Sequence, residues 1–165
     1  GPREIGFDYS FLMPSTGDRV PSVYLENHTI IGLDPNDPIA VSYGEKVGSR
    51  PTGRERPDLL RYQADDQHSD TIINGVSRIG TMAGGEAALW LDEEFVDIFT
   101  GKARDFIRGN KDDPFFLFYS LQARAHLEVP FPSISRFSPK PYRLRLRKPL
   151  TWVCMRLSRG HSIER

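Results

Sequence analysis

Residues 91–119 read LDEEFVDIFTGKARDFIRGNKDDPFFLFY, and this stretch decides the fold class. Its first part predicts a helix over residues 91–108, because apolar side chains recur there at the spacing of one helical face. That face consists of Leu91, Phe95, Ile98, Phe99, Phe106 and Ile107. Asp92 is a candidate N-cap for this helix, and Gly109 followed by Asn110 supplies a C-terminal stop.

The second part of the stretch predicts a buried strand. Pro114 opens the uninterrupted apolar run FFLFY at residues 115–119. Such a run is typical of a strand that is buried on both faces of a parallel sheet. A helix, a short polar link and a buried strand form the αβ half of a βαβ unit, so the sequence predicts an α/β fold.

Upstream of this stretch, the sequence predicts short strands and one long loop. Residues 7–11 alternate aromatic and polar side chains, which is the pattern of a half-buried strand. Residues 23–25 and 29–31 are β-rich runs joined by three polar residues, which predicts a hairpin. Residues 44–70 are polar and punctuated by Gly and Pro, which predicts an irregular surface loop of the kind that often serves as a lid or binding loop.

The charge of the chain is unevenly distributed. The 165 residues carry 22 basic and 22 acidic side chains, so the formal net charge is zero. Residues 136–165 hold nine of the basic groups and one acid, which leaves residues 1–135 with 13 basic and 21 acidic groups. This asymmetry indicates either a binding tail or a segment of different origin. Residues 138–165 are interrupted by prolines, and we expect no helix or strand there.

Composition excludes several classes of protein. The single cysteine, Cys154, rules out an internal disulfide framework and a multi-cysteine zinc site. The longest apolar runs are far shorter than a membrane-spanning helix requires, so no membrane span is expected. The chain begins at Gly1 without a charged-then-apolar signal segment, which indicates a processed chain or a fragment.

Histidines are the main candidates for chemistry. His28 lies at the tip of the predicted hairpin, where a surface role and a substrate contact are both open. His68 lies among Asp65, Asp66 and Asp70, so it is either a solvated loop residue or an imidazole oriented by a carboxylate. His126 lies beyond the carboxyl end of the predicted buried strand, where open α/β sheets bind ligands. The sequence contains no Gly-rich phosphate loop, His-x-x-x-His pair or Gly-x-Ser-x-Gly elbow.

Four segments, in this order, resemble the sulfatase family, in particular bacterial arylsulfatases. They are GPREIGFDYSF at residues 1–11, TGDRVPSVYLENHTIIGLDPNDPI at 16–39, TIINGVSRIG at 71–80 and DPFFLFY at 113–119. The resemblance implies an alkaline-phosphatase-like α/β sandwich with a mostly parallel central sheet, only partly represented here. It also implies hydrolysis of sulfate esters, with a sulfated small molecule or polysaccharide as substrate.

The resemblance also sets expectations for the site. The family uses a C-x-[PA]-x-R motif whose cysteine becomes formylglycine, and a bound Ca²⁺. Cys154 does not match that motif, because Met155-Arg156-Leu157-Ser158 follows it, and ligands for Ca²⁺ are not matched in this chain. The resemblance points to His126 as a displaced counterpart of a catalytic histidine. His28 and His68 are the candidate substrate-binding residues, and no metal ligand is assigned.

The predicted domain division follows from where the resemblance ends. Residues 1–121 are expected to form a partial sulfatase domain, and residues 122–165 a divergent, basic tail that is disordered or results from a frameshift beginning between Gln122 and Phe137. We expect the chain to be inactive by itself. The alternatives are a non-enzymatic module whose basic tail binds anionic polymers, and a phosphoric-ester hydrolase of the same superfamily. No nucleic-acid partner is expected, periplasmic or secreted localisation rests on family analogy alone, and the oligomeric state stays open.

Overall fold

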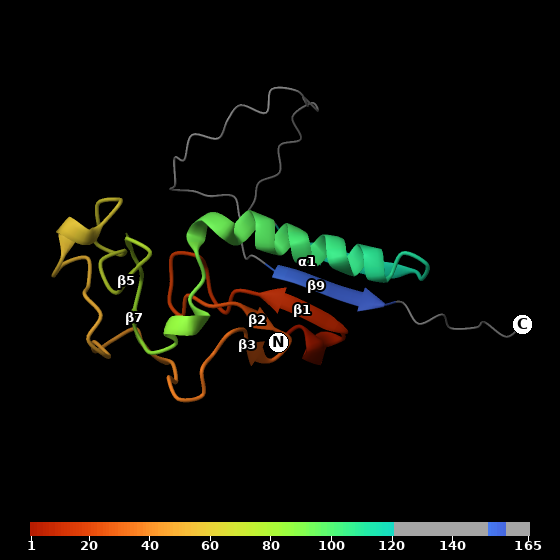
Figure 1. Cartoon of the computed structure of the whole chain (residues 1–165), viewed down its shortest axis with the longest axis horizontal. Helices are drawn as coiled ribbons and strands as arrows, with labels where there is room; N and C mark the ends of the chain where they lie inside the picture. Colours follow the sequence, from red (N-terminus) through yellow and green to blue (C-terminus); the bar gives the residue numbers. More distant parts are fainter. Residues whose placement is uncertain (121–151, 158–165) are drawn as a thin grey trace, which may run out of the picture.

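The computed structural model describes residues 1–120 and 152–157 (Figure 1). Strands and short 3-10 turns (η) dominate, and one long α-helix lies along the main sheet. The elements are η1 Arg3–Ile5, β1 Tyr9–Leu12, β2 Leu25–Glu26, β3 Thr29–Ile30, β4 Ala40–Ser42, η2 Pro57–Leu59, β5 Ile72–Ile73, β6 Val76–Ser77, β7 Thr81–Ala83, η3 Glu86–Ala88, η4 Asp92–Glu94, α1 Phe95–Gly109, β8 Phe115–Tyr119 and β9 Trp152–Leu157. No helix within the described ranges is both long enough and apolar enough to cross a membrane.

The main sheet has the strand order β3-β2-β1-β9-β8, and two strand pairs, β4-β7 and β5-β6, form separate small sheets. Every ladder between the described strands is antiparallel, and the one parallel pairing is an isolated bridge from Arg19 to Ile79. The expected mostly parallel sheet is therefore wrong for the described part of the chain. β1 and β8 do run in the same direction, because each is antiparallel to the strand between them.

That intervening strand, β9, comes from the basic tail. The expectation that residues 138–165 form no strand is wrong, since Trp152–Leu157 pairs with β1 on one side and with β8 on the other. Cys154, for example, lies opposite Ser10 of β1 and Phe118 of β8. A proline-flanked apolar run can join a sheet when two neighbouring strands offer free backbone groups on either side. The predicted domain boundary at residues 121 and 122 stays a prediction.

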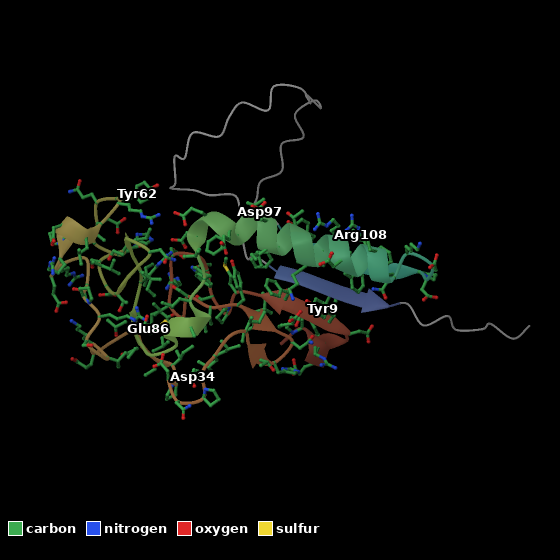
Figure 2. The ribbon with its side chains drawn as sticks, viewed as in Figure 1. Tyr9, Asp34, Tyr62, Glu86, Asp97 and Arg108 are labelled. Atoms are coloured by element: carbon green, nitrogen blue, oxygen red, sulfur yellow. The ribbon has the colours of Figure 1, made fainter. Side chains whose placement is uncertain are left out.

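The helix is confirmed over most of its predicted length, and it covers one face of the sheet (Figure 1). Phe95, Phe99 and Ala103 are buried on its inner side, where they pack with Phe11, Met13 and Trp90. Figure 2 shows Asp97 and Arg108 on the opposite side of α1, away from the sheet. The helix ends at Gly109 with Asn110 as its C-cap, as predicted.

The predicted N-cap is wrong. Asp92 lies inside the 3-10 turn η4 and is buried, and the residue at the N-cap of α1 is Glu94, without a side-chain capping bond. The carboxylate of Asp92 accepts hydrogen bonds from Arg78 and Trp90 instead. The side chain of Asp92 thus pairs with Arg78, 14 residues away in the sequence, and does not cap the helix.

The FFLFY run had predicted a strand buried on both faces, but β8 is partly buried on one face and exposed on the other. Leu117 and Tyr119 pack toward the core beneath α1, and the ring of Phe115 meets that of Phe106 edge-on. Phe116 and Phe118 point the other way and are 56% and 48% exposed. The reason is that α1 packs on one face of this sheet only.

The remaining expectations for the first half of the chain hold. β1 overlaps the strand predicted at residues 7–11 and extends one residue beyond it. β2 and β3 form the predicted hairpin, with Asn27 in the left-handed conformation at its tip. Residues 44–70 contain only the short turn η2. A second core cluster, of Val20, Val23, Ile73, Met82 and Ala88, packs β5, β7 and η3 against the segment at residues 20–23.

Candidate functional site

Residues 77–80 run between two loops and bond to both. On one side, the amide of Ile79 donates to the carbonyl of Asp18 at 2.8 Å, and the amide of Val20 donates to the carbonyl of Ile79 at 3.2 Å. On the other side, the amide of Asp70 donates to the carbonyl of Arg78 at 3.0 Å. The turn at residues 15–18 and the loop at residues 65–70 are therefore fixed relative to each other by one segment.

His68 lies where these two loops meet. Its Nδ1 is 2.9 Å from both carboxylate oxygens of Asp65, and its Nε2 is 3.3 Å from Oδ2 of Asp18. The side chain is 29% exposed, so the imidazole is neither buried nor fully solvated. The carboxylate-oriented alternative for His68 is thus the one that the geometry fits.

The loop itself holds Asp65 in its ionised form. The backbone amide of His68, its imidazole and the backbone amide of Gln67 all bond to Oδ1 of Asp65. These hydrogen bonds lower the pKa of Asp65 to about 2, with the amide of His68 the largest cause. Asp65 is therefore a carboxylate anchored by its own loop.

Asp18 is held from a different direction. Partial burial raises its pKa, but hydrogen bonds from the Thr16 hydroxyl and from His68 outweigh burial, so the pKa of Asp18 lies below its ordinary value. The carboxylate contacts the hydroxyl of Thr16 within the same turn. Asp18, Asp65 and His68 are hereafter called the His68 cluster.

The chemistry open to the His68 cluster follows from its hydrogen-bonding groups. A protonated imidazole donates to both carboxylates, whereas the neutral ring donates at one nitrogen and accepts at the other. The cluster therefore offers carboxylate oxygens that accept hydrogen bonds, beside an imidazole whose two ring nitrogens face them. Such groups suit the hydroxyls of a sugar, while the carboxylates repel an anionic sulfate group.

A buried ion pair underlies this site. Nη2 of Arg78 donates to Oδ2 of Asp92 at 2.6 Å and to the carbonyl of Ile73 at 3.1 Å, while Nη1 donates to the carbonyl of Gly17. Arg78 and Asp92 are only 3% and 4% exposed. Nε1 of Trp90 donates to the other oxygen of Asp92 at 3.0 Å. The pair links the 15–18 turn, the β5–β6 hairpin and the start of the helical segment.

The other candidate histidines are not brought to this cluster. His28 lies at the tip of the β2–β3 hairpin with its side chain 59% exposed, and its Nε2 is 3.4 Å from Oε1 of Glu4. β5 and the loop before it lie at one end of the molecule, away from that hairpin (Figure 1). His126 lies outside the described residues.

The residues in the described ranges do not fit a metal ion. Within those ranges there is no group of three or more His, Cys, Asp or Glu side chains that could hold one. The His68 cluster combines two carboxylates with one imidazole, but its geometry is that of ring-to-carboxylate hydrogen bonds. The Ca²⁺ implied by the family resemblance therefore finds no site in this part of the chain.

Comparison with known proteins identifies the family. No model of a protein family matches the chain. Over 138 residues it is 51% identical to an N-acetylgalactosamine-6-O-sulfatase of Bacteroides thetaiotaomicron. The chain belongs to the sulfatase family. The match includes 84% of this chain and 26% of the relative, so this sulfatase-family chain spans about a quarter of the curated relative's length.

A solved structure supports the same assignment. It is a 6S-sulfatase from work on the metabolism of multiple glycosaminoglycans by Bacteroides thetaiotaomicron, with a TM-score of 0.67 and 53% sequence identity. The match covers 69% of this sulfatase-family chain and 24% of the solved chain. The described residues, one helix against small antiparallel sheets, are thus a partial α/β piece that resembles part of a sulfatase.

Sequence reasoning had noted Asp65 beside His68, but it missed the roles of Asp18, Arg78 and Asp92. Asp18 faces a histidine 50 residues away, and Arg78 pairs with an aspartate 14 residues away. One signal was present: Arg78 stands in the otherwise small and apolar run NGVSRIG, where a charged side chain needs a buried partner. Nothing in the sequence named that partner.

Proposed function

We propose that this chain is part of a sulfatase that hydrolyses the 6-O-sulfate ester of N-acetylgalactosamine residues in glycosaminoglycans. The observation that carries the proposal is the 51% identity over 138 residues to an N-acetylgalactosamine-6-O-sulfatase. The matching solved structure, from work on glycosaminoglycan metabolism, supports the same substrate class. Of the two substrate classes that the sequence resemblance left open, a sulfated small molecule and a sulfated polysaccharide, this proposal takes the polysaccharide. The described sheet and helix are, on this proposal, one part of a larger alkaline-phosphatase-like sandwich.

Within that enzyme, we assign the described loops to the substrate side. The His68 cluster offers hydrogen-bonding partners for sugar hydroxyls, and its two carboxylates make it a poor binding site for the sulfate itself. His68 is the candidate substrate contact that the geometry favours. His28 and the catalytic role of His126 remain predictions from the sequence.

The isolated chain is expected to show no turnover. Its only cysteine, Cys154, is not followed by the residues of the formylglycine motif, so the 165 residues contain no such nucleophile. The test is release of sulfate from 6-O-sulfated N-acetylgalactosamine by the purified chain, with Ca²⁺ added. Release above the buffer blank would contradict this expectation.

A chimera tests the proposed function directly. The matching stretch of the Bacteroides thetaiotaomicron relative is replaced by the corresponding stretch of this chain, and sulfate release is measured on 6-O-sulfated and 4-O-sulfated N-acetylgalactosamine. We expect the chimera to keep the preference for the 6-O-sulfated sugar. A folded chimera that hydrolyses neither sugar, or prefers the 4-O isomer, would overturn the proposal.

The same chimera tests His68. His68→Gln keeps a side chain of similar reach but cannot carry the ring's charge, and we expect KM to rise about tenfold with a smaller change in kcat, as when an interaction made equally in the ground and transition states is lost. His28→Gln in the same background tests the hairpin histidine. An unchanged KM in the His68 variant would exclude a substrate contact at that position.

A further inference from the structure

We propose that Arg78, held by Asp92, is a positioning residue that sets the 15–18 turn so that Asp18 faces His68. The inference rests on the proposed function, because the orientation of Asp18 matters to catalysis only if the His68 cluster meets the substrate. The resemblance to sulfatases assigns no such role to Arg78 or to Asp92.

The guanidinium of Arg78 bonds to three separate stretches of the chain. Its Nη1 donates to the carbonyl of Gly17, the residue directly before Asp18. Its Nη2 donates to the carbonyl of Ile73 at 3.1 Å and to Asp92 at 2.6 Å. Because the amide of Ile79 also bonds to the carbonyl of Asp18, the peptide units on both sides of the Asp18 α-carbon are held from one segment.

The buried pair of Arg78 and Asp92 is a costly arrangement if it serves stability alone. Two charges at 3% and 4% exposure lose most of their hydration, and well-packed apolar side chains often stabilise such a position as well or better. Moreover, Nε of Arg78 is buried without a hydrogen-bond partner among the described residues. A buried pair with one unbonded polar atom contributes little to the free energy of unfolding. The three hydrogen bonds of Arg78, however, fix three separate chain segments.

Lysine cannot replace Arg78 in this arrangement. The planar guanidinium fork reaches two backbone carbonyls and one carboxylate from a single rigid group, whereas an ammonium is a point charge on a flexible stem. Arg78→Lys therefore keeps the charge opposite Asp92 but loses the simultaneous hold on Gly17 and Ile73. This variant separates the pairing of charges from the positioning of the turn.

The experiment follows the carboxylates of the whole chain by ¹³C NMR during acid titration. In the parent, the pKa of Asp18 lies below its ordinary value because Thr16 and His68 bond to it, and that of Asp65 is about 2. In Arg78→Lys we expect the pKa of Asp18 to rise toward 3.8, the value of a carboxyl without these bonds. The pKa of Asp65 should stay where it is, because its partners are in its own loop. The groups that face His68 are the carboxylates of Asp18 and Asp65.

Each outcome of the titration decides the question. A rise in the pKa of Asp18, with no change in the pKa of Asp65, supports the positioning role of Arg78. An unchanged pKa of Asp18 overturns the positioning role. So does a shift of both pKa values together, because it would report a general loosening of the fold. Asp92→Asn, which keeps the shape of the side chain beside Trp90, is a second variant in case the first does not fold. It should also raise the pKa of Asp18. Arg56→Lys, in an exposed pair with Asp58, is the matched control and should move neither Asp18 nor Asp65.

The chimera separates this inference from the proposed function. If the parent chimera is inactive, the proposed function fails. If it is active, Arg78→Lys should lower kcat/KM about tenfold, mostly through KM, because the pair acts through a binding contact. An active chimera whose Arg78→Lys variant matches its Arg56→Lys control would overturn the positioning role alone.

Discussion

Asp65 and Asp92 show two ways in which the carboxylate of an aspartate finds its hydrogen-bond donors. Asp65 is exposed and takes its hydrogen bonds from Gln67 and His68, within its own loop. Asp92 is buried and takes them from Arg78 and Trp90. Removing Asp65 therefore disturbs one loop, whereas removing Asp92 leaves a buried cation unpaired in the core.

The stabilising effect of Asp65 should depend on pH. Because its pKa is lowered from 3.8 to about 2 in the folded chain, its contribution is present above pH 3.8 and is lost as the pH falls toward 2. Urea unfolding of the parent and of Asp65→Asn should differ at neutral pH, and the difference should close in acid. Asp66→Asn, the adjacent exposed carboxylate, is the control, and an equal pH profile for both variants would contradict the prediction.

Breaking the buried pair should be far more damaging than breaking an exposed one. We expect Asp92→Ala to destabilise the chain by about 3–5 kcal/mol, because it leaves Arg78 charged and unpaired in the interior. Arg61→Ala breaks the exposed pair with Glu93 and should change the free energy of unfolding by about 0–1 kcal/mol. Equilibrium urea unfolding compares the two variants, and similar values would count against a buried pair.

At the scale of the elements, the two faces of α1 differ in what surrounds them. Phe99 packs edge-on against the rings of Phe11 and Tyr24, whereas Val96 is 53% exposed on the outer side. This difference follows from the spacing of apolar residues at 3 and 4 positions, which places one face of the helix against the sheet.

The inner face of α1 should carry most of its contribution to stability. Phe99→Ala leaves a cavity beside Phe11 and Tyr24, and we expect it to lower the free energy of unfolding by about 3–5 kcal/mol. Val96→Ala removes an exposed side chain and should change it by no more than about 0.5 kcal/mol. Thermal or chemical unfolding monitored by circular dichroism distinguishes the two, and comparable losses would show that the helix is not packed as described.

At the scale of the whole molecule, the main sheet joins three distant stretches of chain. β1, β8 and β9 come from residues 9–12, 115–119 and 152–157, and β9 lies between the other two. The predicted division into a folded part and a divergent tail at residue 121 thus depends on whether β9 holds the sheet together in solution.

A proline in β9 tests this arrangement. Cys154→Pro removes a backbone N–H from a strand with neighbours on both sides, where proline is rarely tolerated. We expect faster amide hydrogen exchange in β1 and β8, with little change in the distant β5–β6 hairpin. Unchanged exchange in β1 and β8 would instead favour the tail as a segment that does not belong to the sheet.

The sequence by itself determined the local elements and the family. Local patterns fix backbone conformation through spacing and turn chemistry. Such patterns are the helical period of residues 95–109 with its Gly–Asn stop, the β2–β3 hairpin and the apolar run of β8. The four family segments likewise lie along the chain in a readable order.

Only the tertiary structure decided which partners these elements take. It placed β9 antiparallel between β1 and β8, left Phe116 and Phe118 exposed, moved Asp92 from a helix cap to a buried ion pair, and brought Asp18 to His68. The physical reason is that a strand's neighbours, a sheet's covered face and a buried charge's partner are set by packing between residues far apart in sequence. No spacing within a short window encodes those contacts.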